Sequence, residues 1–174
     1  KTLQCYFRAD GKPGSLKAGL ERVGRYAVDA VEDGFEVLIL QDRAIDSDHA
    51  PMPSLLATAA VHHHLIKTKK RMQIGIIVET AEPREIMHFA LLLGYGASVV
   101  NPYLAFEAIK LILEEENSKT SPEDGIHHYI KAVNKGILKV LSKMGISTLQ
   151  SYRGAQIFEA LGLDKSVIDR CFQG

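Results

Sequence analysis

The sequence predicts an α/β fold in which βα units repeat and a parallel sheet of four to five strands is flanked by helices. Apolar runs of strand length alternate with longer segments whose apolar residues recur every three or four positions. The run at residues 37–40 is continuously apolar, which is typical of a strand covered on both faces. This alternation implies helical crossovers between parallel strands, and it suits an open sheet and part of a barrel equally well.

The first βα unit is predicted over residues 3–40. A strand at residues 3–7 is followed by a Gly- and Pro-containing turn. Ser15 is expected to cap a helix, because apolar residues then recur with helical spacing. Gly34 follows the end of this helix, where a left-handed residue is common. The next strand is the apolar run at residues 37–40.

Two further units follow. Residues 42–53 are expected to form a long loop before a helix over residues 54–69. Residues 73–80 read as the third strand. Pro83 suits the first turn of a helix that ends at Gly94.

The last part of the chain is predicted to be mostly helical from residue 118 onward and to lead toward another domain. A fifth, short strand is expected near Thr148, and a helix is expected to start at Gly154. Asp164 can cap the last helix. The other predicted elements are a strand at 97–101, a helix at 103–116, a surface loop at 117–125 and a helix at 126–144.

Length and composition favour one domain of ordinary size over residues 1–174. The 21 basic residues balance the 21 acidic ones, so no nucleic-acid partner and no membrane surface is expected. Cys5 and Cys171 lie far apart and form no metal-ligand spacing, which favours a reducing, cytoplasmic setting. The chain begins without Met inside a predicted strand, so we interpret it as part of a longer, multidomain chain.

Polar residues follow the predicted strands. Because parallel strands place their carboxyl ends at one rim of a sheet, these side chains are candidates for a shared site or an interdomain contact. The alternative is that the carboxylates cap helices while the arginines pair locally. The candidates are Asp42, Arg43, Glu79, Arg84, Asn101, Tyr103, Gln150, Tyr152 and Arg153.

Three consecutive histidines, at residues 62–64, are conspicuous on a predicted helix. Neighbouring helical residues point about 100° apart, so all three cannot bind one metal ion. We therefore expect no metal site and interpret the histidines as packed or solvent-bridging side chains. No nucleophile lies beside a base, and no complete catalytic set is evident.

Three ordered blocks of the sequence are distinctive. The first contains Asp42-Arg43, Ala50-Pro51-Met52-Pro53-Ser54-Leu55-Leu56-Ala57 and Val61-His62-His63-His64-Leu65. The second contains Val78-Glu79, Arg84-Glu85, His88-Phe89-Ala90, Leu93-Gly94-Tyr95-Gly96-Ala97 and Asn101-Pro102-Tyr103-Leu104-Ala105-Phe106-Glu107. The third covers residues 129–132, 135–136 and 142–163. Together these blocks resemble the large subunit of the glutamate synthase family.

This resemblance implies a place in a larger enzyme of nitrogen assimilation. The family hydrolyses glutamine in an amidotransferase domain and passes ammonia to an FMN-binding barrel, where 2-oxoglutarate becomes glutamate. The chain resembles the second half of the central domain, with the amidotransferase and FMN domains as its partners. FMN and an iron–sulfur cluster belong to the whole enzyme, and no cofactor is expected in this fragment. No catalytic residue carries over, since Cys5 lies within a strand-like run.

The sequence is therefore compatible with three functions. The first is a connecting domain that supports ammonia transfer and is inactive alone, with Gln150, Tyr152 and Arg153 fixing it against the FMN barrel. In the competing view of that run, Arg153 pairs internally with Glu159. The second function is a free-standing module that binds a small anion or phosphate through Arg43, Arg84 or Arg153. The third is a metal-dependent hydrolase that uses the histidines.

Overall fold

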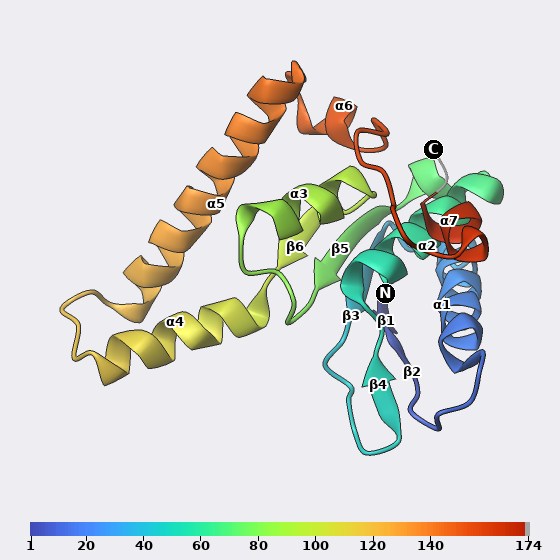
Figure 1. The fold of residues 1–174 in the computed structure, drawn as a ribbon, viewed down its shortest axis with the longest axis horizontal. Coiled ribbons are helices and arrows are strands. Elements are labelled where there is room, and N and C mark those ends of the chain that lie inside the picture. Colours follow the sequence, from blue (N-terminus) through green and yellow to red (C-terminus); the bar gives the residue numbers. More distant parts are fainter. Residues whose placement is uncertain (173–174) are drawn as a thin grey trace.

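The computed structural model describes residues 1–172, so the last two residues of the predicted domain lie outside it. Its centre is a parallel sheet of four strands (Figure 1). The strand order is β1 (Thr2–Gln4), β3 (Val37–Gln41), β5 (Gly75–Glu79) and β6 (Val99–Asn101). The predicted α/β class and parallel sheet are confirmed.

Three helices connect these strands: α1 (Ser15–Glu32), α2 (Ser54–Lys67) and α3 (Ile86–Gly94). Each strand of this sheet pairs with the sheet strand that comes before it in the chain, so the order of strands in the sheet follows the sequence without a reversal. Because crossovers in such sheets share one hand, this order places the helices on one face, and α1 packs on α2 and α2 on α3. This is the arrangement of part of a (β/α)8 barrel rather than a doubly wound sheet.

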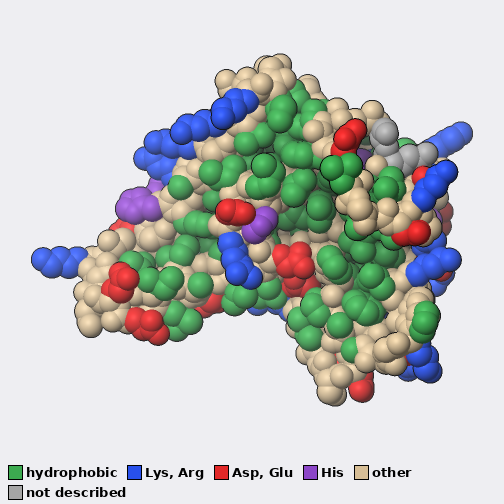
Figure 2. Space-filling model, in the orientation of Figure 1, with side chains coloured by type: hydrophobic (Ala, Val, Ile, Leu, Met, Phe, Trp, Pro, Cys, Tyr) green, Lys and Arg blue, Asp and Glu red, His purple; other side chains and the backbone are tan. Residues whose placement is uncertain are grey.

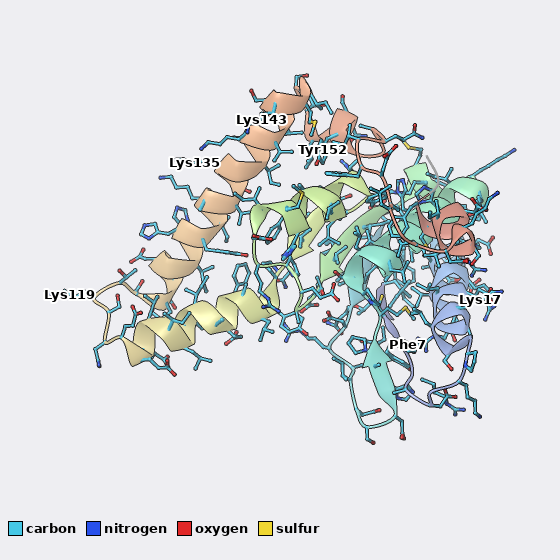
Figure 3. All side chains as sticks on the ribbon, viewed as in Figure 1. Phe7, Lys17, Lys119, Lys135, Lys143 and Tyr152 are labelled. Atoms are coloured by element: carbon cyan, nitrogen blue, oxygen red, sulfur yellow. The ribbon has the colours of Figure 1, made fainter. Side chains whose placement is uncertain are left out.

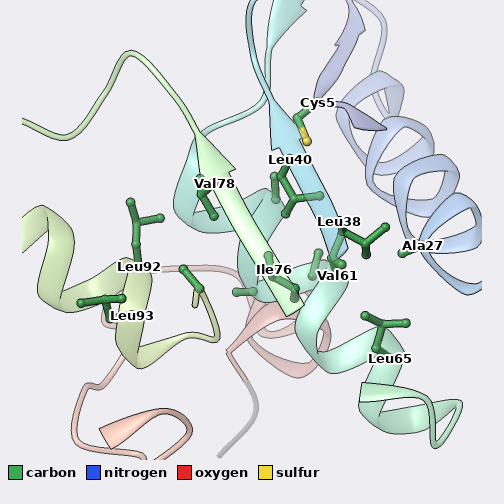
Figure 4. Close-up of a cluster of buried hydrophobic side chains, with 14 of the residues drawn as sticks. Cys5, Ala27, Leu38, Leu40, Val61, Leu65, Ile76, Val78, Leu92 and Leu93 are labelled. Carbon is green, nitrogen blue, oxygen red and sulfur yellow. The ribbon is translucent and has the colours of Figure 1, made fainter. Parts of the chain in front are cut away.

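The core lies between the sheet and these helices. Alternate strand residues Leu38, Leu40, Ile76 and Val78 point toward the helices and are almost fully buried (Figure 4). The opposite face of the sheet, here called the second face, is less covered by the described residues. Val37 is 41% exposed and Val99 is 52% exposed. The expectation that residues 37–40 are covered on both faces is therefore wrong within this chain.

The predicted first strand is divided in two. The chain bends at Cys5, and β2 (Tyr6–Arg8) leaves the main sheet to pair antiparallel with β4 (His49–Pro51). The predicted loop at residues 42–53 thus contains a strand. The Cys5 N–H donates to the Gln41 carbonyl, and the Met52 N–H donates to the Cys5 carbonyl. These two hydrogen bonds fix the small sheet at the end of the large one.

Two helix starts differ from the prediction. Gly14, with φ +94°, occupies the N-cap of α1, and the Ser15 hydroxyl donates a 2.6 Å hydrogen bond to Asp10 instead of capping. Helix α3 starts at Ile86, so Pro83 lies in the preceding loop and not in the first turn of the helix. Gly34 is left-handed with φ +84°, as predicted.

Helices α4 (Tyr103–Glu115) and α5 (Pro122–Met144) form a hairpin that stands off the sheet (Figure 1). A Cβ on Gly125 would lie 2.6 Å from Leu113 Cδ1, so glycine permits the close approach of the two helices. The predicted loop at residues 117–125 is shorter, because Ser121 caps α5 by accepting from the Asp124 N–H. Helix α5 then packs back against α3.

The prediction of a fifth strand near Thr148 is wrong. Thr148 caps the short helix α6 (Leu149–Tyr152), and its hydroxyl accepts from the Ser151 N–H. The helix expected at Gly154 is also absent, since Gly154 is left-handed with φ +70° and residues 155–163 form no helix. Asp164 caps α7 (Lys165–Cys171) as predicted, and α7 packs on α2. Among the described residues, no helix is long and apolar enough to cross a membrane.

Candidate functional site at the carboxyl ends of the strands

A ladder of polar side chains crosses the second face of the sheet. Gln4, Gln41 and Glu79 are in register on neighbouring strands. Gln4 Nε2 donates to Gln41 Oε1 at 2.8 Å, and Gln41 Nε2 donates to Glu79 Oε2 at 2.6 Å. The other Glu79 oxygen accepts from Arg43 Nε at 2.7 Å. The Gln41 hydrogen bond, followed by that of Arg43, lowers the pKa of Glu79.

Asp42 follows β3 directly and lies 6% exposed. Its carboxyl accepts from the Thr80 hydroxyl at 2.6 Å, the Ala81 N–H at 3.1 Å and the Tyr103 hydroxyl at 2.8 Å. Burial, and then this bond to Asp42, raises the pKa of Tyr103 to about 12. The Arg43 guanidinium stacks 3.8 Å above the Tyr103 ring.

These contacts bring five of the predicted residues together at one rim: Asp42, Arg43, Glu79, Asn101 and Tyr103. Asn101 pairs in register with Glu79, and its carbonyl accepts from the Thr80 N–H at 3.1 Å. The carboxylates of Asp42 and Glu79 already accept several hydrogen bonds from within the chain. The arrangement can hold three strands and α4 together.

Arg84 lies in the loop after β5, outside this network. Its backbone carbonyl accepts from the Tyr129 hydroxyl at 3.0 Å, and its N–H donates to His88 Nδ1. In the same loop, Glu82 accepts from both the N–H and the hydroxyl of Ser54. That carboxylate lies at the start of α2, where it satisfies an N–H of the first turn.

The remaining three candidates lie at the opposite end of the sheet, so the prediction of a shared rim is wrong for them. Arg153 donates to the Ser98 hydroxyl at 3.0 Å and to Gln150 Oε1 at 2.6 Å. Ser98 immediately precedes β6, which places these groups at its amino end. Tyr152 is 1% exposed and packs near Gly94. Arg153 therefore does pair internally, with Ser98 and Gln150 instead of Glu159.

A buried His–Arg pair near Arg153 was not foreseen. His62 Nδ1 accepts from Arg71 Nε at 2.8 Å, and Arg71 also donates to the carbonyls of Ile74 and Gly96. Burial, and then the Arg71 charge, lowers the pKa of His62 to about 4. A Cβ on Gly96 would lie 2.3 Å from His62 Nδ1, so the second glycine of 94–96 was the sequence signal for this contact.

An open cavity of about 880 Å³ lies beside this pair, between α2 and the irregular segment after Gly154. Aromatic side chains line much of it, and Tyr95 donates to the Phe158 carbonyl at 3.3 Å across one wall. No group of three His, Cys, Asp or Glu side chains within residues 1–172 is placed to hold a metal ion. The histidines thus offer the hydrolase hypothesis no support.

This geometry also gives little support to the anion-binding hypothesis. Arg43 pairs with Glu79 at one end of the sheet, whereas Arg153 is bound to Ser98 and Gln150 at the other. Arg84 contacts neither group through a hydrogen bond or ion pair in the part of the chain that the structure describes. Arg43 and Arg153 are thus already bound within the chain.

Comparison with known proteins agrees with the resemblance seen in the sequence. A protein named glutamate synthase (NADH) from Schizosaccharomyces pombe is 45% identical over 171 residues, which cover 97% of this chain and 8% of that protein. The glutamate synthase (NADPH) large chain of Bacillus subtilis is 47% identical over 159 residues, or 91% of this chain and 10% of that protein. The chain thus spans about a tenth of these relatives.

Solved structures confirm the fold. A flavocytochrome b2 mutant with benzoylformate superimposes with a TM-score of 0.62 at 12% identity, over 84% of this chain and 37% of that one. The flavin-binding domain of the baker's yeast protein gives 0.56 at 15% identity, over 87% and 38%. The family described as glutamate synthase central domain matches residues 1–164. The chain belongs to the glutamate synthase central domain family.

Proposed function

We propose that this chain is the connecting domain of a glutamate synthase and has no complete active site of its own. The observation that carries the proposal is the Asp42 and Glu79 network, in which the candidate rim residues bind one another. Those carboxyl groups fix strands to α4 and are not held free for a substrate. A scaffold between catalytic parts needs this kind of internally paired rim.

In this proposal the neighbours are an amidotransferase domain and an FMN-binding domain of the same enzyme. Glutamine hydrolysis, FMN and the iron–sulfur cluster lie in those neighbours, and this chain supports the passage of ammonia between them. Residues 1–174 act as one α/β domain, and the helical segment from residue 118 leads toward the FMN domain. The buried free thiols of Cys5 and Cys171 suit a cytoplasmic setting.

Arg153 has a particular role in this proposal. It joins α6 to the residue before β6, and the Gly154 N–H donates to the Gly94 carbonyl at 2.9 Å. These bonds fix the direction in which the chain leaves α6 and so position Gln150 and Tyr152. Tyr152 is already buried inside this chain, so it does not contact the neighbouring domain directly. The segment 150–153 therefore contributes to docking through its own rigidity.

The test is Arg153→Ala in a full-length glutamate synthase large chain that carries this segment. We expect the glutaminase reaction to persist while glutamate formed per glutamine hydrolysed falls, since a loosened segment misplaces the neighbouring domain. Lys17→Ala, an exposed change on α1, is the matched control. Unchanged coupling together with unchanged thermal stability would show that Arg153 has no docking role.

A second measurement tests the wider proposal on the 174-residue chain alone. The purified chain is assayed for glutaminase activity and for flavin absorbance after incubation with FMN. We expect neither turnover nor stoichiometric flavin. Robust glutamine hydrolysis or one bound flavin per chain would refute a connecting role and would require an active site in this segment.

A further inference from the structure

Helix α5 carries a row of four lysines on its outer side: Lys131, Lys135, Lys139 and Lys143. All four are exposed, whereas Val133, Gly136, Ile137 and Leu141 on the other side are buried. Figure 2 shows basic side chains gathered along this edge of the molecule, and Figure 3 labels Lys135 and Lys143 pointing outward from it. We call these four residues the lysine ridge.

The lysine ridge lacks ion-pair partners among the described residues. None of the four lysines forms an ion pair there. The acidic residues of α5 are Glu123 and Asp124, both in its first turn and therefore remote from most of the ridge. The whole chain is neutral, so four adjacent positive charges are a local concentration and not a reflection of overall composition.

The spacing makes this concentration costly to the isolated helix. Residues four apart are neighbours on a helix surface, so the ridge contains three successive like-charge pairs. Attraction to the negative helix C-terminus offsets the repulsion for Lys143, but that effect fades within the last turn. Lys131 and Lys135 lie further back, and an external negative charge is what would relieve their repulsion.

The ridge is also held rigidly. Gly136 lies on the inner side of α5, where a Cβ would come 2.3 Å from Ile86 Cδ1, so α5 and α3 are in close contact. Tyr129 binds the Arg84 carbonyl, and Gly145, with φ +68°, ends the helix as a left-handed C-cap. A partner would therefore meet charges whose backbone is already fixed, which lowers the entropic cost of association.

We propose that the lysine ridge is the docking surface for an acidic protein surface that lies outside residues 1–174. The four charges span about 18 Å and advance by about 40° at each step, because four residues exceed one helical turn slightly. A ridge of this type packs into the groove of a second helix that crosses at an angle. The partner it fits is a helix with carboxylates at a similar four-residue spacing.

A protein partner fits better than nucleic acid. The ridge contains lysines alone, without the arginines and stacking aromatics that typify nucleic-acid surfaces, and the chain has a pI near 7.2. This inference goes beyond the connecting role, because that role does not specify which surface meets a partner or with what charge.

The principal test is zero-length carbodiimide cross-linking, which joins lysine amines to carboxylates in direct contact. It is applied to a full-length glutamate synthase large chain that carries this segment, and the products are read by mass spectrometry. We expect ridge lysines linked to Asp or Glu beyond this segment, and loss of those links in the Lys131→Gln/Lys135→Gln/Lys139→Gln variant. Lys17 and Lys119, which lie off the ridge, are the internal controls.

A second arm compares the 174-residue chain with the full-length chain. In the short chain at low salt, Lys135→Gln should raise Tm by about 1–3 °C because two repulsive pairs disappear, and 0.5 M salt should remove the gain. In the full-length chain the same change should lower Tm. No ridge cross-links beyond residues 1–174, links only to a second copy, equal Tm shifts in both chains, or tight binding of single-stranded DNA would each overturn the proposal.

Discussion

Tyr103 donates a 2.8 Å hydrogen bond to Asp42, which joins the first residue of α4 to the residue that follows β3. Sixty-one positions separate the two residues in the chain. The α4–α5 hairpin stands off the sheet, so this bond is one of the few polar ties at its base. This hydroxyl therefore helps to hold the start of α4 against the sheet, in addition to the packing of α5 on α3.

Tyr103→Phe should lower the free energy of unfolding by about 1–3 kcal/mol, the usual cost of leaving a buried acceptor without one of its donors. Urea titration measures this change. Tyr26→Phe, on an exposed part of α1, should leave the unfolding midpoint unchanged. Equal stability of the two variants would mean that the Asp42 contact contributes nothing.

Alkaline pH should weaken the fold. Burial and the bond to Asp42 raise the pKa of Tyr103 from 10.0 to about 12, so the folded state keeps its proton where the unfolded chain loses it. The resulting stability is fully present below pH 10 and is lost as pH rises toward 12. Unfolding midpoints measured from pH 9 to 12 should fall less steeply in Tyr103→Phe. Burial also raises the pKa of Cys5 to about 12, so part of the slope should remain.

Acid should act through His62. Its pKa is lowered from 6.5 to about 4, mainly by burial. Between these two pH values the unfolded chain therefore protonates this histidine while the folded chain keeps it neutral. The stability is complete above pH 6.5 and should fall on the order of 2–3 kcal/mol by pH 4.5. His62→Gln keeps an acceptor for Arg71 and should flatten this pH dependence, whereas the exposed His127→Gln should not. Parallel profiles for the two variants would contradict the assignment.

The effect of Gly136→Ala on the free energy of unfolding should change sign when Ile86 is also replaced. In the natural chain the new Cβ meets Ile86 at 2.3 Å, so overpacking should cost roughly 1–3 kcal/mol. With Ile86→Ala in place the clash is gone, and the better helix propensity of alanine should stabilise α5 by up to about 1 kcal/mol. A double-mutant cycle in urea measures both effects. The same sign in both backgrounds would show that the contact does not limit the packing of α5.

Periodicity predicted the main helices and parallel strands because each buries a stripe or face of apolar residues. It failed where one hydroxyl had two possible partners. Ser15 binds Asp10 instead of capping α1, and Thr148 caps α6 although its surroundings resemble a strand. The exposure of Val99 was equally hidden, because an apolar strand reads the same whether or not its second face is covered.

The same limits apply to the site. Asp42, Glu79 and Asn101 could be placed at one rim because each ends or follows a parallel strand. Arg153 was misplaced because its position rested on a fifth strand that does not exist. Gly96 signals a close approach at that turn, but the sequence does not say that His62 is the residue that approaches or that Arg71 binds it.

The unreversed strand order has a consequence for how the chain folds during synthesis. Each strand of the main sheet pairs with the strand made just before it in that sheet, so no early strand waits for a distant partner. Pairings between successive units keep loop-closure costs low compared with sheets whose first and last strands are neighbours. The βα units can therefore join the sheet in the order in which they leave the ribosome, with β6 added after β5. Helix α7 is made last and then packs back on α2.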